Sequence, residues 1–383
     1  MKKTKKEIQS EIVNNLIMSP STNNLVIAAT GVGKSKIAID YLKTFFVKKK
    51  ANILIVIPTI ELRDIDWPNE LKKWNITNTM LKNIRIECYA SLTKIKNMTF
   101  DLVIFDEIHR TTEFNSIVFE NNIIKHALGL TATFPKDPMK QYLLKVYNFN
   151  TIANIPLDEA VKLGLISPYE IKIIPVWLNN TIKDIPAGNS SKRFYVTERG
   201  QYDYITNTID VLKEKIDNSV YCNHYDVQKL KFLRLMRAKF LSNLNSKIII
   251  GKETLLKIDQ KNERTLIFAN SIATAEAMHF HTYHSGKKSK EKGLHLQKFR
   301  DGEINTLACV NGLNEGVNIS DVDNAIIMQV NASDLILTQR IGRTLRLKEG
   351  KDCLSKIFIL CAQNTVDEDW VNSVTKNLNV ICD

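Results

Sequence analysis

Long apolar runs are missing from this sequence of 383 residues. The longest are of the kind seen at residues 53–57, whereas a helix that spans a membrane needs about 18 apolar residues. The first six residues are mostly basic, and no apolar segment of the signal-peptide kind follows them. We therefore expect no membrane partner and a soluble, cytoplasmic protein, located in a bacterium or, if a phage encodes it, in the host cell.

Cysteine pairs, internal repeats and low-complexity segments are missing as well. Because no Cys-x-x-Cys spacing occurs, neither a disulfide framework nor a structural zinc site is indicated, and we expect reduced, mostly buried thiols. His279, His281 and His284 have a spacing that metal ligands can have, but no Cys or fourth ligand lies nearby, so surface or core histidines are favoured. The cysteines are Cys88, Cys222, Cys309, Cys353, Cys361 and Cys382.

Size and charge set the first positive expectations. At about 150 residues per domain, a chain of 383 residues suggests two domains. The formal net charge of +12 favours a polyanionic partner, and a uniformly basic surface is the alternative. Charge alone does not decide between them.

Short apolar runs separated by amphipathic stretches occur in two series. Runs that are apolar on both faces suit a parallel sheet with helices on both sides, so we predict an α/β fold with two domains, residues 1–154 and 155–383. Residues 169–176 alternate like a strand of the second sheet, and residues 197–259 have a helical pattern. The runs are residues 25–27, 51–57, 84–88 and 102–105, then 265–269, 304–309, 325–330 and 355–360.

The most informative motif is Ala28-Ala29-Thr30-Gly31-Val32-Gly33-Lys34-Ser35, which follows the first apolar run and opens an amphipathic stretch. In a strand, loop and helix of this kind, backbone N–H groups surround phosphate oxygens. The lysine reaches the β- and γ-phosphates, and the hydroxyl after it ligates Mg²⁺. A tight turn before a helix is the plain alternative, but Lys34-Ser35 directly after the second glycine favours a triphosphate site.

Two acidic residues, Asp106 and Glu107, follow the apolar run at 102–105. The carboxyl ends of parallel strands share one edge, so both acids should lie near the phosphate loop. There Asp106 can hold Mg²⁺ and Glu107 can deprotonate an attacking water. Alone, such a pair is often favourable charge at a helix N-terminus, but Lys34 and Ser35 favour the catalytic interpretation.

A third motif, residues 339–346, lies near the C-terminal end of the chain. Arg343 and Arg346 are three residues apart, so they share a face of the predicted helix and can point at one anion. Arginines that reach a γ-phosphate from a second domain stabilise charge in the transition state. A basic helix end is the alternative, and it would be preferred if the first two motifs were absent.

In order and spacing, these motifs resemble those of superfamily 2 helicases and translocases, which have two RecA-like domains with ATP between them. The resemblance extends from about residue 7 to 375 and is closest to the DNA-acting branch of phage recombination and repair helicases and restriction-enzyme motor subunits. Ile108 stands where the best-known RNA helicases have Ala. The matched segments are residues 28–35, 55–59, 89–92, 106–109, 131–133, 265–269, 311–318 and 339–346.

This resemblance implies a role for each matched residue. The catalytic set would be Lys34, Asp106, Glu107, Gln339, Arg343 and Arg346, with Mg²⁺ on Ser35 and Asp106. ATP would be held by Thr30, Gly31, Val32, Gly33, Lys34, Ser35, Gly316 and Asn318, with Gln9 as the adenine-reading residue or, alternatively, a surface glutamine. Nucleic acid would be held by Pro58, Thr59, Arg63, Ser91, Asn311 and Gly312. The residues that couple the two sites would be His109, Thr131 and Thr133.

The implied function is that of an ATP-dependent helicase or translocase on DNA, in replication, recombination or repair. DNA is favoured over RNA as the partner, and we expect a monomer that has replication, repair or nuclease proteins as further partners. The alternative is a remodelling ATPase, or the motor partner of a separate nuclease, that does not unwind. An RNA helicase is the less favoured third option.

Overall fold

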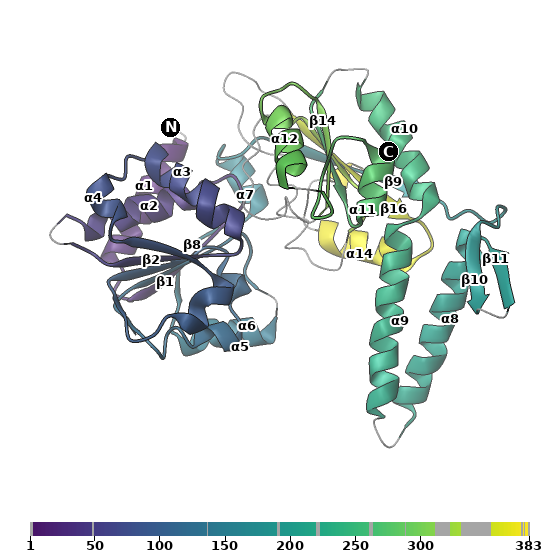
Figure 1. The fold of residues 1–383 in the computed structure, drawn as a ribbon, viewed down its shortest axis with the longest axis horizontal. Coiled ribbons are helices and arrows are strands. Elements are labelled where there is room, and N and C mark those ends of the chain that lie inside the picture. The colour runs from purple at the N-terminus through teal and green to yellow at the C-terminus, as the bar shows by residue number, and fades with distance from the viewer. Residues whose placement is uncertain are drawn as a thin grey trace. The chain divides into compact units, whose positions relative to one another are not determined.

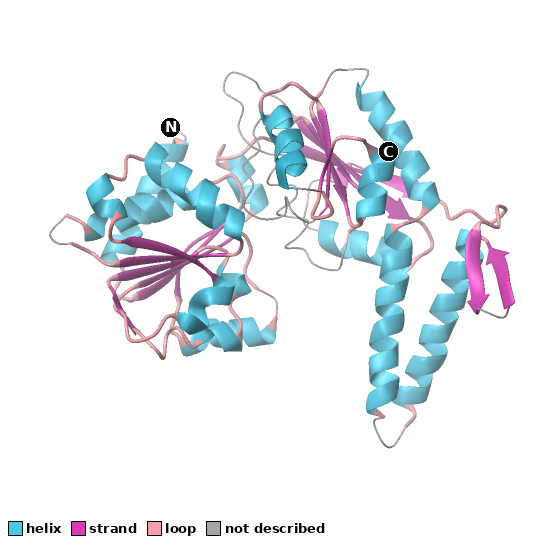
Figure 2. Ribbon diagram, in the orientation of Figure 1, coloured by secondary structure: helices cyan, strands magenta, loops and turns pink. Residues whose placement is uncertain are grey.

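The computed structural model describes residues 3–47, 50–135, 137–189, 192–219, 223–259, 263–287, 289–310, 322–330, 354–376, 378 and 380–381. These residues form two compact units (Figure 1). The first contains the chain up to Tyr169, and the second contains most of the described residues from Glu170 onward. In each unit helices cover both faces of a central sheet (Figure 2), which confirms the predicted α/β class.

The sheet of the first unit has six strands in the order β3-β2-β5-β7-β1-β8, and all of its pairings are parallel. The central strands β2 and β5 are buried on both faces, as the apolar runs predict. The strands β7 and β8 were not predicted from the sequence. The bounds are β1 Asn23–Ala28, β2 Ile53–Ile57, β3 Ile84–Cys88, β5 Leu102–Phe105, β7 Ala127–Thr131 and β8 Asn150–Ile155.

The helices of the first unit begin with α1, Lys5–Met18, whose first turn carries a capping box between Thr4 and Glu7. A π-helical turn, Leu62–Asp66, leads directly into α3, Trp67–Lys73. The 3₁₀-helices are Tyr89–Lys94 and Ile108–Arg110, and a small sheet pairs β4, Thr99–Phe100, with β6, Ile123–Ile124. The other helices are α2 Lys34–Phe45, α4 Asn78–Leu81, α5 Glu113–Ser116, α6 Pro138–Val146 and α7 Leu157–Lys162.

The sheet of the second unit has the order β13-β14-β12-β15-β16-β9-β17 in the described part of the chain. β9 lies between β16 and β17, so the prediction that residues 169–176 join the second sheet is confirmed. The strands are β9 Tyr169–Val176, β12 Thr265–Ala269, β13 Thr282–Tyr283, β14 Thr306–Val310, β15 Asn324–Ile327, β16 Ser355–Ala362 and β17 Val380–Ile381. The helices around it include α11 Ile272–Met278, α12 Ser289–Arg300 and α14 Val366–Thr375.

The helical pattern of residues 197–259 corresponds to α8 Glu198–Asp217, α9 His224–Ser242 and α10 Asn245–Asp259. Within the second unit, α8 and α9 form a long pair of neighbouring helices (Figure 1), held by a cluster that includes Ile205, Ile209 and Leu230. An antiparallel hairpin of β10, Ile185–Asn189, and β11, Lys192–Val196, precedes them. This hairpin was not predicted from the sequence.

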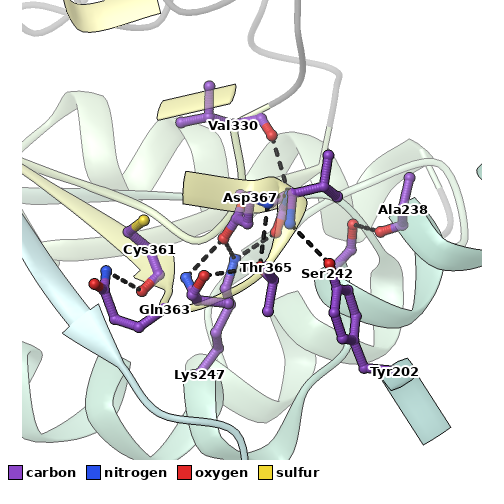
Figure 3. A network of polar contacts seen from close by, with 12 residues as sticks. Tyr202, Ala238, Ser242, Lys247, Val330, Cys361, Gln363, Thr365 and Asp367 are labelled. Carbon is purple, nitrogen blue, oxygen red and sulfur yellow. Dashed lines mark hydrogen bonds and ion pairs between the residues drawn. The ribbon is translucent and has the colours of Figure 1, made fainter. Parts of the chain in front are cut away.

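A buried polar network joins α10, the segment that follows β15, the end of β16 and α14 (Figure 3). Lys247 on α10 donates to Asp367 Oδ2 at 2.6 Å and also contacts Gln329 Oε1. Asp367 accepts two further hydrogen bonds, from Gln329 Nε2 at 2.7 Å and from Ala362 N at 2.8 Å. The side chains of Lys247 and Asp367 are 1% and 0% exposed, so this ion pair lies in the core of the unit.

In the described ranges no helix combines the length and apolar character required to cross a membrane. Cys88, Cys309 and Cys361 are buried, and burial together with the charge of Asp367 raises the pKa of Cys361 to about 12.

Candidate active site

The predicted phosphate loop connects β1 to the first turn of α2. Gly31 and Gly33 have φ angles of +96° and +99°, a region that favours glycine, and Val32 between them is fully buried. Lys34 is the first residue of α2, and its Nζ lies 3.0 Å from the carbonyl oxygen of Ala28. The local geometry is that of a glycine-containing loop that opens a helix N-terminus, where backbone N–H groups can bind an anion.

Two side chains of α1 donate hydrogen bonds to backbone carbonyl oxygens of this loop. Gln9 is buried, and its Nε2 donates to Val32 O at 2.8 Å, while Lys5 Nζ donates to Gly31 O at 2.6 Å and to Leu165 O at 3.2 Å. A Cβ atom on Gly33 would lie 2.3 Å from Gln9 Nε2, the far end of a flexible side chain, so it is the φ angle that favours glycine at this position. The structure therefore shows Gln9 in contact with the loop. Its adenine-reading role stays a prediction.

Asp106 is the first residue after β5, at the same edge of the sheet. Its N–H donates to Val56 O at 2.8 Å, and its carboxylate accepts from Trp67 Nε1 at 3.0 Å. The hydroxyl of Tyr89 donates to the backbone carbonyl of Asp106 at 3.0 Å. Burial and the neighbouring charge of Glu107 raise the pKa of Asp106 to about 6, despite the opposing effects of Trp67 and Lys34.

Glu107 has a left-handed backbone conformation, with φ +54° and ψ +56°. Non-glycine residues with such angles are strained and cluster at functional sites. Its side chain is 13% exposed, and its Oε2 lies 3.3 Å from His109 Nδ1. The turn at Glu107 thus ends the buried strand and leaves the second acid partly accessible at the sheet edge.

His109 connects Glu107 to the end of β7. Its Nδ1 lies 3.2 Å from Thr131 Oγ1, and the Thr131 hydroxyl donates to Thr133 O at 2.9 Å. Because the proton of Thr131 is used in that bond, Nδ1 of His109 is the donor toward Thr131, and the carboxylate of Glu107 lies within ion-pair distance of the same nitrogen. Three residues predicted to couple the two sites, His109, Thr131 and Thr133, therefore form one hydrogen-bonded chain that begins beside the second acid.

The packing of the segment between Glu107 and His109 against the sheet depends on a glycine in β7. A Cβ atom on Gly129 would lie 2.7 Å from Ile108 Cδ1 and 3.1 Å from Leu25 Cδ1. Ile108 is buried, and it stands between Glu107 and His109 in the sequence. Gly129 therefore lets Ile108 pack closely on the sheet.

The predicted nucleic-acid residues of the first unit follow the two neighbouring strands β2 and β3. Pro58 and Thr59 come directly after β2, and Arg63 in the π-helical turn pairs with Asp64 at 2.7 Å. Ser91 lies in the 3₁₀-helix that follows β3 and is half-buried. Since β2 is next to β5 in the sheet, these segments adjoin Asp106 along the same edge.

Some predicted residues lie outside the described part of the chain. They are Asn311, Gly312, Gly316, Asn318, Gln339, Arg343 and Arg346. Trp67, Tyr89 and Lys5 are parts of the site that were not predicted from the sequence. Tyr89 lies in a matched segment but was given no role, and Trp67 carried no signal beyond being an aromatic residue soon after Arg63.

The donor atoms at this edge fit Mg²⁺ bound together with phosphate. No cluster of three His, Cys, Asp or Glu side chains able to hold a metal occurs among the residues that the model describes. Mg²⁺ commonly keeps several waters and is bound through one or two carboxylates plus the phosphates of the substrate. The hydroxyl of Ser35 and the carboxylate of Asp106 are a donor set of that type.

Comparison with known proteins decides the family. The model for the type III restriction enzyme res subunit matches residues 2–136, and the model for the helicase conserved C-terminal domain matches residues 246–348. Over 353 residues the chain is 28% identical to the DNA 3′-5′ translocase XPB2 of Sulfurisphaera tokodaii, an alignment that covers 87% of this chain and 77% of that protein. The chain belongs to the superfamily 2 helicases and translocases.

Other relatives of this superfamily 2 protein agree with that placement. A putative ATP-dependent RNA helicase of Methanocaldococcus jannaschii is 25% identical over 452 residues, which cover 91% of this chain and 57% of that protein. The crystal structure of the Pyrococcus furiosus Hef helicase domain is similar with a TM-score of 0.52 and 17% identity, over 96% of this chain and 97% of that one. The fold is thus that of two RecA-like domains, and the enzyme is an ATP-hydrolysing helicase by family.

Proposed function

We propose that this protein is a DNA-dependent ATPase that couples ATP hydrolysis to movement along DNA or to its unwinding. The observation that carries the proposal is the single sheet edge on which the phosphate loop, Asp106, Glu107 and the His109–Thr131 hydrogen bond lie together. The likeness to a DNA translocase over most of both chains supports DNA as the partner. Replication, recombination and repair are the processes in which such a motor would act.

In the ATPase reaction, the loop from Thr30 to Ser35 would bind the phosphates through its backbone N–H groups, with Lys34 at the β- and γ-phosphates. Ser35 and Asp106 would hold Mg²⁺, which neutralises phosphate charge when it is bound. Glu107 would orient the attacking water and accept its proton, and His109 Nδ1 would fix the position of that carboxylate. Gln9 would contact the adenine, as its position beside the loop allows.

The second domain would complete the ATP site. We propose residues 1–154 and 155–383 as the two RecA-like domains. The second would supply Gln339, Arg343 and Arg346 toward the γ-phosphate, with Gly316 and Asn318 nearby. Arginine supplied from a second domain stabilises the charge that develops in phosphoryl transfer. Alternating closure and opening of the two domains would then move the protein along one strand.

Nucleic acid would lie along the segments that follow β2 and β3, with Pro58, Thr59, Arg63 and Ser91 on the sugar-phosphate backbone. Asn311 and Gly312 would add contacts from the second domain. Contacts of this type position a strand without determining its sequence. We therefore expect strong stimulation by nucleic acid and weak dependence on base sequence.

RNA is the second candidate partner, because one of the relatives is named as a putative RNA helicase. A non-unwinding remodelling ATPase, or the motor partner of a separate nuclease, is the alternative in mechanism. Unwinding of a forked duplex by the isolated chain would exclude the non-unwinding alternative. An ATPase rate that is stimulated by RNA and not by DNA would show that RNA is the partner.

The proposal is tested by ATPase rates with single-stranded DNA, duplex DNA, branched DNA and RNA, followed by strand displacement on the best activator. We expect DNA to stimulate the wild-type rate and Lys34→Ala to abolish the stimulated rate while leaving the unfolding midpoint near that of the wild type. Lys36→Ala is a matched control two residues further along α2, because Lys36 pairs with Asp40 rather than with the loop. Equal rates with and without every nucleic acid would overturn the proposal.

A further inference from the structure

The strand order divides the carboxyl edge of the first sheet into two halves. The phosphate loop follows β1 on one side of β5, whereas the proposed nucleic-acid segments follow β2 and β3 on the other side. Asp106 follows β5, where the two halves meet. A group that joins a segment of the second half to Asp106 would connect the two sites directly.

Trp67 is one such group. The N–H of Trp67 donates to Leu62 O, five residues earlier, which closes the π-helical turn that contains Arg63. One extra residue in a helical turn rotates the following side chains by about 100° relative to an α-helix, and such turns are frequent at functional sites. With that rotation the indole is 2% exposed, and its Nε1 donates to Asp106 Oδ2 at 3.0 Å.

Tyr89 makes a second connection, from the segment after β3. It is the first residue of the 3₁₀-helix that contains Ser91, and its hydroxyl donates to the carbonyl oxygen of Asp106 at 3.0 Å. Burial keeps the pKa of Tyr89 well above its usual value, so the hydroxyl stays a donor. Asp106 is therefore held at its side chain by one segment and at its backbone by the other.

We propose that Trp67 and Tyr89 are positioning residues that transmit the binding of nucleic acid to Asp106. The inference rests on the proposed function, because it takes Pro58, Thr59, Arg63 and Ser91 as the contacts with the strand. Both aromatic side chains are buried, so neither is itself a surface on which bases can stack. A strand that shifts the turn of Arg63 or the 3₁₀-helix of Ser91 would shift the hydrogen bonds that orient the carboxylate.

The first test needs neither nucleotide nor metal. The full chain is labelled with 5-fluorotryptophan, its four tryptophan signals are assigned by single substitutions to Phe, and oligothymidylate is added in the presence of a chelator. We expect the ¹⁹F signal of Trp67 to shift as the strand binds, and that shift to be reduced in Asp106→Ala. Trp74 is the internal control, because its Nε1 donates to Glu70 on the same helix rather than to Asp106.

The second test separates stimulation from basal turnover. We expect Trp67→Phe and Tyr89→Phe each to lower the stimulation of kcat by DNA about tenfold, with a smaller change in KM for ATP. Trp74→Phe and Tyr147→Phe are the matched controls, because the hydroxyl of Tyr147 donates to Ser116 O at a site without Asp106. Tyr89→Phe loses a single oxygen, so it tests the proposal even if Trp67→Phe fails to fold.

The outcomes are distinguishable from failure of the proposed function. Binding of fluorescein-labelled oligothymidylate is followed by anisotropy on the same samples. A strand that binds without moving the Trp67 signal, together with full stimulation in Tyr89→Phe, would overturn this inference alone. Absence of both binding and stimulation by any nucleic acid would overturn the proposed function and the inference with it.

Discussion

Two carboxylates follow strands of the two sheets, and their surroundings are opposite in kind. Asp367, at the start of α14, is fully buried against Lys247 and accepts hydrogen bonds from Gln329 Nε2 and Ala362 N. Asp106, after β5, accepts one indole N–H beside a second acid, and its pKa is raised to about 6. The first charge is compensated within the fold, whereas the second is left to be compensated by what binds there.

This difference separates a carboxylate that stabilises the fold from one that is poised for a ligand. Buried charges persist in proteins when paired and hydrogen-bonded, and groups with perturbed pKa values cluster at functional sites. The left-handed Glu107 beside Asp106 adds backbone strain to the same turn. Near Asp367 the left-handed residue is Asn364, with φ +55°, and asparagine adopts this conformation more readily than glutamate does. The N–H of Asp367 donates to Thr365 Oγ1 at 3.1 Å.

The largest effect on stability is expected from Lys247→Met. The substitution leaves the charge of Asp367 without its cation, and breaking a buried pair in this way costs about 3–5 kcal/mol of unfolding free energy. Adding Asp367→Asn should recover part of the loss, since an amide oxygen can still accept from Ala362 N. Denaturant unfolding measures both values.

Lys215→Met is the matched control for that experiment. Lys215 pairs with Asp226 at 2.8 Å, but its side chain is 65% exposed, so the loss should stay below about 1 kcal/mol. Equal losses in the two single variants would mean that burial does not distinguish the two ion pairs.

A smaller effect is expected from Gly129→Ala beneath the Glu107 turn. The new Cβ would lie 2.7 Å from Ile108 Cδ1 in a buried site, and overpacking of this size costs about 1–2 kcal/mol. Ile108→Val removes the clashing atom, so the double variant should regain stability by thermal unfolding. No difference between the single and double variants would contradict the packing account of Gly129.

The smallest effect is a pH dependence that comes from Asp106. Its pKa in the folded protein, about 6, lies above the ordinary value, so the folded state holds a proton that the unfolded state releases between about pH 4 and pH 6. The metal-free wild type should therefore lose stability as the pH rises through that window. Asp106→Asn has no such group, so its stability should rise relative to that of the wild type as the pH increases through the window.

The measurement is a series of unfolding curves for both proteins in the presence of a chelator. If the difference in unfolding free energy between the two proteins stays constant with pH, Asp106 titrates as an exposed carboxyl does. If instead the wild type gains stability relative to Asp106→Asn as the pH rises, the folded state favours the ionised form.

Local patterns in the sequence predicted which residues carry the chemistry of the site. They did not predict the hydrogen bonds from other segments that hold those residues in place. The loop at Thr30–Ser35 and the acids Asp106 and Glu107 are defined by residue type and spacing, and the structure places them on one edge. The bonds from Gln9 and Lys5 to the loop, and from Trp67 to Asp106, join residues 23 to 39 positions apart. No short motif encodes such tertiary contacts.

Prediction of the strands from the sequence was limited in the same way. Strongly apolar runs predicted β1, β2, β5 and β12, because burial on both faces leaves a pattern that needs no partner to be recognised. β7 is equally buried but was missed, because Gly129 and Thr131 interrupt its apolar run. β8 was missed because it is mostly exposed or half-buried, and β10–β11 because a hairpin outside the main sheets has no continuous apolar run. The network of Lys247 joins three segments up to 120 positions apart and had no signal in the sequence.

The most direct test of the account is the DNA-stimulated ATPase rate of Glu107→Gln, measured beside its unfolding midpoint. The account predicts a loss of at least about 100-fold in kcat with a midpoint near that of the wild type, because the amide cannot accept the proton of the attacking water. A stimulated rate close to that of the wild type would contradict the assignment of this sheet edge as the active site.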